Sequence, residues 1–420
     1  GFYIGWQPLY CDKIKNPPYI CISKDKISMS ENLLTFSALE LFLAGITGVL
    51  FIIQILYYLV TYARPLRAAR EAESRVRVTA DKEVKPVSVI VYAHGEPEDL
   101  RNNLPAFLNQ DYPDYEVIVV NDGSDAESED VLKLFSNEHK HLYYTYVPAG
   151  AHYLSHKKLA LTMGIKASKH DILLFTEADC RPLGPKWIAT MAGTYNPETE
   201  IVLGFCTYRH TKGFFQKLIA YDNLMNGLQM LSSALSHRPY TGNGRNLSYR
   251  KQLFFARKGY SKSLYLHAGA DDLFINEAAT GTNTQVQYSP DALTEMGKIE
   301  DSGIWKEMKV SRAATGRYYK GNALLFYRMD NYSNLLFLLT AVAGFITGIL
   351  GNWLVSILTG LLLVLHFTAK AVVLRKSALL LQQKPLTAWL PVLEIAQPAY
   401  NLYVRIYRLF KWRKDFTTKI

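Results

Sequence analysis

Two acidic residues separated by a single position, Glu177 and Asp179, close an apolar run over residues 171–180. Alternate residues of a strand or its extension point to the same side, so we expect the two carboxylates to share a face. Such carboxylates repel each other unless a cation lies beside them, and Mg²⁺ or Mn²⁺ accepts one or two carboxylates together with phosphate oxygens. The pair therefore predicts a divalent metal site that holds a nucleotide diphosphate. A solvated turn with a helix-capping Asp is the alternative.

The elements that must position this pair alternate between short β-branched runs and amphipathic stretches from residue 86 to about 326. This alternation is typical of βαβ units, and it predicts an α/β domain with a mostly parallel sheet. Runs 87–93 and 115–125 end in the polar clusters 94–96 and 121–123. Ligands of open α/β sheets bind beyond the carboxyl ends of the strands, so we expect all three acidic strand ends to meet in one crevice. Ordinary turn chemistry is the alternative for each cluster.

Composition and charge limit the class of protein. The chain has 420 residues, a hydrophobic fraction of 49% and a formal charge of +10, which excludes a small disulfide scaffold and a disordered polar chain. Residues 41–63 carry no charge and are long enough for one transmembrane helix. Residues 331–369 form a second uncharged run, which Gly351 and Asn352 divide into a predicted hairpin of two spanning helices.

Basic residues follow both the first span and the hairpin, and such residues favour the cytoplasmic side of a membrane. We therefore expect a multi-pass protein of the inner, cytoplasmic membrane whose middle region faces the cytosol. Cys11 and Cys21 precede the first span and could pair outside, whereas Cys180 and Cys206 are expected to stay reduced. The basic residues that set the orientation are Arg64, Arg67, Arg70, Arg75, Arg77, Lys370, Arg375 and Lys376.

The last segment is apolar over residues 386–410 but contains Glu394, Pro398, Arg405 and Arg408, which favours an interfacial helix over a fourth span. The basic residues that follow oppose only Asp415, and membrane lipids with anionic headgroups are the expected partners. We expect no nucleic-acid partner, because the positive charge flanks membrane segments. The expected organisation is an extracytoplasmic or non-native segment 1–35, a transmembrane helix 36–63, a basic linker 64–86, a catalytic domain 87–326, a helical hairpin 331–374, and an interfacial helix with a basic tail 375–420.

The motifs of the middle region resemble those of membrane-bound family 2 glycosyltransferases of bacterial type, which have the GT-A nucleotide-sugar-binding fold. VSVIVYAHGEPEDL and YEVIVVNDGSD are similar to the first two strands of that family, and LLFTEADCRP is similar to its metal-binding DxD motif. The resemblance implies that Glu96 and Asp122 contact base and ribose, and that Lys157 of HKKLALTMGI lies near the diphosphate. It also implies that Asp179, with Glu177, holds Mg²⁺ or Mn²⁺, although Glu177 departs from the usual Asp.

Three downstream segments extend the resemblance. TGNGRNLSYRKQLF is similar to the family's GxGxNLAYRK segment, which implies that Gly244 and Asn246 lie near sugar and acceptor. GADDLFIN lies where the family has its catalytic acid, but the expected Asp falls on Ala270, which leaves Asp271 or Asp272 as the base. Asp272 capping a helix is the alternative for that residue. The 305–321 segment is similar to the family's Trp-containing region, which implies that Trp305, Lys309 and Arg312 lie near the departing diphosphate, with Met308 replacing the usual Gln.

The expected function is therefore an inverting transfer from a nucleotide sugar donor to a lipid-linked or other glycan acceptor near the membrane. Three spans offer little material for an export channel, which disfavours a processive polysaccharide synthase. Two further functions stay open at this point, a catalytically silent membrane scaffold of the same fold and a nucleotidyltransferase. The departures at Ala270 and Met308 are the residues that make a silent scaffold conceivable.

Overall fold

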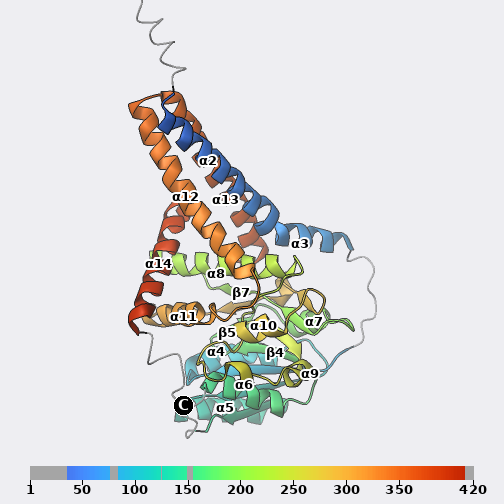
Figure 1. Cartoon of the computed structure of the whole chain (residues 1–420). Helices are drawn as coiled ribbons and strands as arrows, with labels where there is room; N and C mark the ends of the chain where they lie inside the picture. The colour runs from blue at the N-terminus through green and yellow to red at the C-terminus, as the bar shows by residue number, and fades with distance from the viewer. Residues whose placement is uncertain (1–35, 76–83, 124, 149–154, 412–420) are drawn as a thin grey trace, which may run out of the picture. The chain divides into compact units, whose positions relative to one another are not determined.

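The computed structural model describes residues 36–75, 84–123, 125–148 and 155–411. The chain divides into two compact units, which are shown in Figure 1. Among the described residues, one unit combines residues 36–57 with 329–369, and the other combines those of 58–328 with 370–411. The predicted pairing of Cys11 with Cys21 and the predicted basic tail beyond residue 411 lie outside the described residues.

Three helices among the described residues are long and apolar enough to cross a membrane, as the sequence predicts. The predicted break at Gly351 and Asn352 is confirmed, because α12 ends at Leu350 and α13 begins at Trp353. The Glu40 carboxylate accepts the Asn352 backbone N–H at 2.7 Å, which satisfies a donor at this turn. A Cβ on Gly351 would lie 2.5 Å from the same carboxylate, so the turn favours a glycine. The three candidate spans are Ala38–Ala72, Ala323–Leu350 and Trp353–Leu380.

The first apolar run is less regular than the single helix expected for residues 41–63. Helix α2 (Ala38–Leu56) is followed by a π-helical turn at Tyr57–Tyr62, and α3 (Arg64–Arg75) continues the chain. The Ala63 N–H donates to the Tyr58 carbonyl, five residues before it, at 2.9 Å, and Pro65 has no backbone N–H with which to continue the regular pattern into α3. The extra turn and α3 carry the candidate span beyond the predicted end of the run.

The α/β domain contains a seven-stranded sheet of order β3-β2-β1-β4-β8-β6-β9. The first four of these strands are parallel, and β8 is antiparallel to both of its neighbours. The predicted α/β domain with a mostly parallel sheet is confirmed. The strands are β1 (Val87–Ala93), β2 (Tyr115–Asn121), β3 (Leu142–Tyr146), β4 (Ile172–Glu177), β6 (Ile201–Leu203), β8 (Leu247–Arg250) and β9 (Thr284–Val286).

Helices cover both faces of this sheet, because its central strands are apolar on both sides. Side chains of α4 (Pro97–Leu108), α5 (Ala126–Glu138) and α7 (Trp187–Ala192) pack on one face in a single large core cluster. On the other face, α6 (His156–Ala167) packs against Ile118 and Val120 of β2. The short helix α9 (Lys251–Ala256) directly follows β8.

Strand β4 ends at Glu177, earlier than the run 171–180 predicts. Ala178 and Asp179 form a turn, and Cys180 begins a separate strand, β5 (Cys180–Pro182). This strand pairs with β10 (Thr294–Met296), which also pairs with β7 (Cys206–Tyr208), and the three form a small second sheet. The turn is fixed because the Ala178 N–H donates to the Tyr92 carbonyl at 2.8 Å. Cys180 and Cys206 are buried free thiols, as expected.

Four helices complete this unit, and three of them pack together (Figure 1). Trp305 of α11 stacks on Tyr400 of α14 with ring centroids 4.3 Å apart. Lys370, at the end of α13 that belongs to this unit, forms a buried ion pair with Glu394 of α14. The segment predicted as an interfacial helix is thus helical, and its location at a membrane stays a prediction. The four helices are α8 (Phe214–Ala234), α10 (Asp272–Ala278), α11 (Ser302–Thr315) and α14 (Leu390–Lys411).

Candidate active site

The acidic ends of the parallel strands lie near one another. Tyr92 of β1 is in register with Glu177 of β4, so the two strands end at the same level of the sheet. Burial, and then the nearby carboxylates of Asp179 and Glu177, raise the pKa of Glu96 to about 7, against the opposing effect of a hydrogen bond from the His94 N–H. These carboxylates therefore share one negative electrostatic environment at the carboxyl edge of the sheet.

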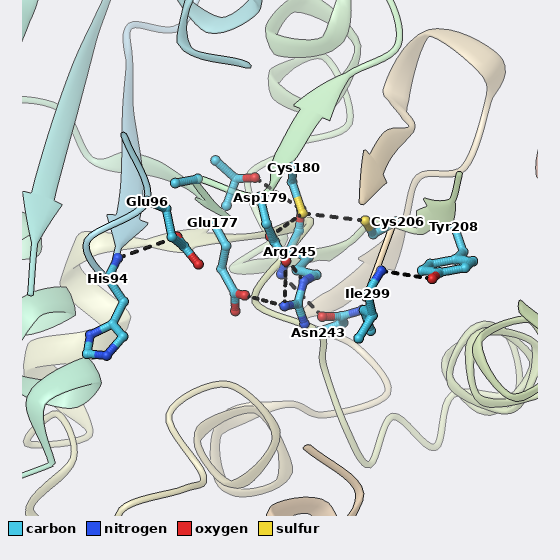
Figure 2. A network of polar contacts seen from close by, with 12 residues as sticks. His94, Glu96, Glu177, Asp179, Cys180, Cys206, Tyr208, Asn243, Arg245 and Ile299 are labelled. Carbon is cyan, nitrogen blue, oxygen red and sulfur yellow. Dashed lines mark hydrogen bonds and ion pairs between the residues drawn. The ribbon is translucent and has the colours of Figure 1, made fainter. Parts of the chain in front are cut away.

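Two basic side chains, those of Lys157 and Arg245, neutralise the carboxylates at this edge of the sheet. Lys157 Nζ lies 2.5 Å from Glu177 Oε1. Arg245 lies 2.7 Å from Glu177 Oε2 and 2.9 Å from Asp179 Oδ2 (Figure 2). Burial opposes ionisation of Glu177, but Arg245 and Lys157 together hold its pKa down to about 2. Glu177 is therefore ionised at neutral pH. The next lysine, Lys158, is fully buried and donates instead to backbone carbonyls, which leaves Lys157 as the lysine that faces the site.

A cavity of about 410 Å³ lies at this edge of the sheet. Lys157, Glu177 and Arg245 lie on its wall, together with both aspartates of the predicted base motif, Asp271 and Asp272. The structure thus brings one of the predicted metal ligands, the predicted diphosphate lysine and the candidate bases to one site. A cavity of this size accommodates a small polar ligand.

Asp271 and Asp272 differ in environment. Asp272 is 7% exposed and accepts hydrogen bonds from Thr315 Oγ1 at 2.5 Å and Tyr319 OH at 2.8 Å. Burial, and then the neighbouring Asp271, raise the pKa of Asp272. Asp271 precedes the first residue of α10 without capping it, and its Oδ2 accepts the Gly244 N–H at 2.7 Å. Asp271 therefore has an oxygen available to a ligand, whereas both oxygens of Asp272 bind protein groups.

The far wall of the cavity comes from α8 and α11. Trp305, Lys309 and Arg312 line it, as does Asp222, for which the sequence alone carries no recognisable signal. Lys309 Nζ donates to Asp222 Oδ1 at 2.7 Å, and Gln397 of α14 donates to the same oxygen at 2.8 Å. Burial lowers the pKa of Lys309 and Asp222 opposes that shift. Lys309 is therefore held by a structural partner, and Arg312 is the better placed cation for a ligand.

Asn246, which the resemblance implies is near sugar and acceptor, is an interior residue. Its side chain is 1% exposed and donates to the Phe205 carbonyl at 2.9 Å and the Ala292 carbonyl at 2.8 Å. It also accepts from Trp187 Nε1 at 3.2 Å. These bonds occupy the side-chain amide, so Asn246 anchors the glycine-rich segment to the protein interior. Gly244, two residues earlier, lies at the site and contacts Asp271.

Asp122, the predicted ribose ligand, does not line the cavity. Its side chain is 2% exposed and accepts from Tyr92 OH at 2.8 Å, while His156 Nδ1 lies 2.6 Å and His94 Nδ1 3.3 Å from its oxygens. Tyr92 connects this group to the cavity, since Lys157 Nζ lies 5.5 Å from its ring centroid. Asp122 thus contacts Tyr92 and not the cavity. Its pairing with the two histidines is not apparent from the sequence.

The residues at the strand ends fit a divalent metal that is shared with a substrate. Among the described residues, no group of three or more His, Cys, Asp and Glu side chains could hold a metal by itself. Glu177 and Asp179 nevertheless direct oxygens at one point, because a single guanidinium nitrogen contacts both. Mg²⁺ and Mn²⁺ bind through one or two carboxylates plus phosphate oxygens, so two acids suffice when a diphosphate supplies the other ligands.

Comparison with known proteins identifies the domain. Residues 88–254 match the family described as "Glycosyl transferase family 2". The chain carries a glycosyl transferase family 2 domain. It is also 24% identical over 246 residues to "Probable glycosyltransferase YdaM" from Bacillus subtilis, a match that covers 57% of this chain. The match spans 56% of the length of that relative.

The fold is similar to that of a solved glycosyltransferase. The mannosyltransferase PcManGT from Pyrobaculum calidifontis, solved with GDP-Man and Mn²⁺, superposes with a TM-score of 0.50 at 18% identity. The match covers 81% of this chain and 99% of that one, and it supports the GT-A-like fold. Staphylococcus aureus TarS 1-349 in complex with UDP-GlcNAc gives a TM-score of 0.39 at 15% identity, covering 77% of this chain and 92% of that one.

Proposed function

We propose that this family 2 enzyme is an inverting, metal-dependent glycosyltransferase that uses a nucleotide diphosphate sugar. The observation that carries the proposal is the shared cavity, in which Lys157, Glu177 and Arg245 line one part of the wall and Asp271 another. Cations at one end and a carboxylate at the other match the charges that develop during glycosyl transfer. The similar PcManGT structure contains GDP-Man and Mn²⁺, which supports a nucleotide sugar as donor.

The residues have separable roles in this reaction. The bond between the anomeric carbon and the diphosphate oxygen breaks, and the departing oxygen keeps the electron pair. Lys157 and Arg312 neutralise the charge that accumulates on the diphosphate, because both line the cavity. Glu177 and Asp179 would hold Mg²⁺ or Mn²⁺, which supplies further positive charge to the same phosphate oxygens. Glu96 and Asp122 are proposed to contact the nucleoside, Asp122 through rearrangement of its histidine partners.

Asp271 is the proposed base. The acceptor hydroxyl transfers its proton to the Asp271 carboxylate while its oxygen forms the new bond to the anomeric carbon from the face opposite the diphosphate. The Gly244 N–H holds one carboxylate oxygen at 2.7 Å, which orients the group. The buried Asp272 is proposed to support α10 through Thr315 and Tyr319, since its oxygens are occupied there.

The acceptor is proposed to be lipid-linked or membrane-proximal. Three helices that could span a membrane belong to the same chain as the cavity, which supports catalysis beside a bilayer. The basic residues after the spans favour a cytosolic active site at the inner membrane. Apolar side chains exposed on α14, including Ile395, Leu402 and Ile406, support its location at the membrane surface.

The product decides between this function and the competing ones. The purified full-length chain is incubated with single nucleotide sugars, Mn²⁺ and extracted membrane lipids, and the products are analysed by mass spectrometry. We expect one sugar to be added to a lipid, with loss of this product in Asp271→Asn. A long extruded polymer would indicate a processive synthase, a nucleotide on the product a nucleotidyltransferase, and no turnover with any donor a silent scaffold.

A further inference from the structure

Arg245 is the one residue that contacts both carboxylates of the proposed metal site, among the ion pairs of the described residues. One guanidinium nitrogen, Nη2, lies 2.7 Å from Glu177 Oε2 and 2.9 Å from Asp179 Oδ2 (Figure 2). A second guanidinium nitrogen, Nε, lies 3.4 Å from Asp179 Oδ1. The arginine comes from the glycine-rich segment before β8, whereas both acids come from the end of β4. The ion pairs of Arg245 therefore link the segment before β8 to the end of β4.

The backbone of Arg245 is held firmly enough to aim its side chain. Its carbonyl accepts hydrogen bonds from Thr176 Oγ1 at 3.3 Å and Thr294 Oγ1 at 3.0 Å, and its N–H donates to Asn243 Oδ1 at 3.2 Å. The next residue, Asn246, is fixed in the interior by its own amide. The side chain of Arg245 is 16% exposed and still lines the cavity. It is thus placed by the sheet, yet it remains in reach of a ligand.

A divalent cation and this guanidinium require the same oxygens. The two carboxylates converge on Nη2 at distances that leave no room for a second cation between them, and two like charges there would repel strongly. Within the part of the chain that the structure describes, Asp179 forms its ion pair with Arg245, whereas Glu177 also has Lys157 at 2.5 Å. Asp179 therefore depends on Arg245 more than Glu177 does.

We propose that Arg245 is a positioning residue that exchanges between the two acids and the donor diphosphate. It neutralises Glu177 and Asp179 in the free protein, releases them when metal and nucleotide diphosphate bind together, and pairs with the diphosphate instead. The exchange makes metal binding weak until the nucleotide is present, because only the diphosphate offers Arg245 another partner. This inference rests on the proposed function and assigns Arg245 a role in coupling the two ligands.

The chain offers a matched control. Arg250 ends β8 and pairs with Asp171, just before β4, at 2.9 Å, so it also joins these two strands. It does not line the cavity and contacts neither Glu177 nor Asp179. Removing Arg250 therefore removes another ion pair that links β8 to the neighbourhood of β4, without changing the proposed metal ligands.

The test measures Mn²⁺ binding to the full-length protein in detergent, by the electron paramagnetic resonance signal of free Mn²⁺. Without nucleotide, we expect Arg245→Met to bind Mn²⁺ at least about tenfold more tightly than wild type, because the acids lose an internal competitor. Arg250→Met should match wild type. Adding GDP or UDP should tighten Mn²⁺ binding in wild type by a larger factor than in Arg245→Met.

Equal or weaker Mn²⁺ affinity in Arg245→Met, with Arg250→Met unchanged, would overturn the proposal. If Arg245→Met does not fold, Arg245→Gln decides in the same way, because glutamine keeps a polar side chain but carries no charge that competes with Mn²⁺ for the two acids. Its Mn²⁺ affinity should exceed that of wild type, and equality would again count against the exchange. Failure of the proposed function has a different signature, since the wild type would then bind neither GDP nor UDP with or without Mn²⁺.

Discussion

Two clusters of buried charge line the same cavity, and they differ in how completely their partners satisfy them. At the strand ends, Lys157 lines the cavity with a side-chain exposure of 29%, and the neighbouring Asp179 side chain is 24% exposed. Between the helices, the Asp222 and Lys309 side chains are 6% and 13% exposed, and Gln397 completes the group. The first cluster can exchange partners with a ligand, whereas the second is closed by protein groups. We infer that the strand-end cluster serves the reaction and the helix cluster holds the cavity wall.

The largest expected effect is a loss of transfer activity when an acid of the strand-end cluster is removed. Asp179→Ala should lower transfer about 1000-fold, because it removes a charge on which the diphosphate end of the site depends. Initial rates with saturating Mn²⁺ and donor measure this, and the thermal unfolding midpoint of the same sample serves as the control. Near-wild-type rates in a folded variant would show that the strand-end acids do not support the reaction.

The two neighbouring aspartates provide the next test. Asp271→Asn should lower the rate about 100-fold or more, since general base catalysis is lost while the side-chain shape is kept. Asp272→Ala should mainly lower the unfolding midpoint, because Thr315 and Tyr319 lose a buried acceptor. Pre-steady-state rates and calorimetric midpoints of both variants distinguish these outcomes. The assignment of the base is reversed if Asp272→Asn, and not Asp271→Asn, abolishes transfer in a folded protein.

Substitutions in the helix cluster should change the free energy of unfolding. Lys309→Met leaves Asp222 buried without its cation, and breaking such a pair costs about 3–5 kcal/mol. The double variant Asp222→Asn with Lys309→Met should recover much of this loss, because no unpaired charge remains. Denaturant titrations in detergent give the free energies of unfolding of the three proteins. An unchanged value for Lys309→Met would remove the distinction between the clusters.

The smallest effect concerns Glu96 and pH. Its pKa is about 7 in the folded protein against an ordinary 4.5, so the folded state keeps a proton that the unfolded chain has lost between these values. Stability should therefore fall as pH rises from about 4.5 to about 7. Glu96→Gln removes this titration, and its unfolding midpoint should fall less over the same interval. Parallel pH profiles of wild type and variant would show that Glu96 is not buried among these acids.

Much of the fold follows from local sequence. The apolar runs of β1, β2 and β4 lie within the predicted strands, because parallel strands covered on both faces are apolar on both sides. The break at Gly351 and Asn352 is equally local. The π-helical turn at Tyr57–Tyr62 was not predicted, since composition and charge do not specify how hydrogen bonds are arranged inside an apolar run.

Cavity-lining residues were predictable where a recognisable local motif carries them, as at the end of β4, at the start of α6 and along α11. Lys157 and Glu177 were found in this way. The interior position of Asn246 depends on carbonyls of residues 205 and 292, which are distant in sequence. Arg245 was visible as a charged residue within a glycine-rich segment, but its two partners became known only from the pairing of β4 with β8.

The most direct test of the central claim is calorimetric binding of a nucleotide sugar to the purified chain, with Mn²⁺ and with a chelator. GDP-mannose is a suitable first probe, because the PcManGT structure contains it, and UDP-N-acetylglucosamine tests a different base and sugar. We predict that at least one nucleotide sugar binds more tightly with Mn²⁺, and that Glu177→Gln with Asp179→Asn abolishes this difference. Binding that is equally tight with the chelator, or unchanged in the double variant, would contradict the assignment of the strand-end acids to metal and diphosphate.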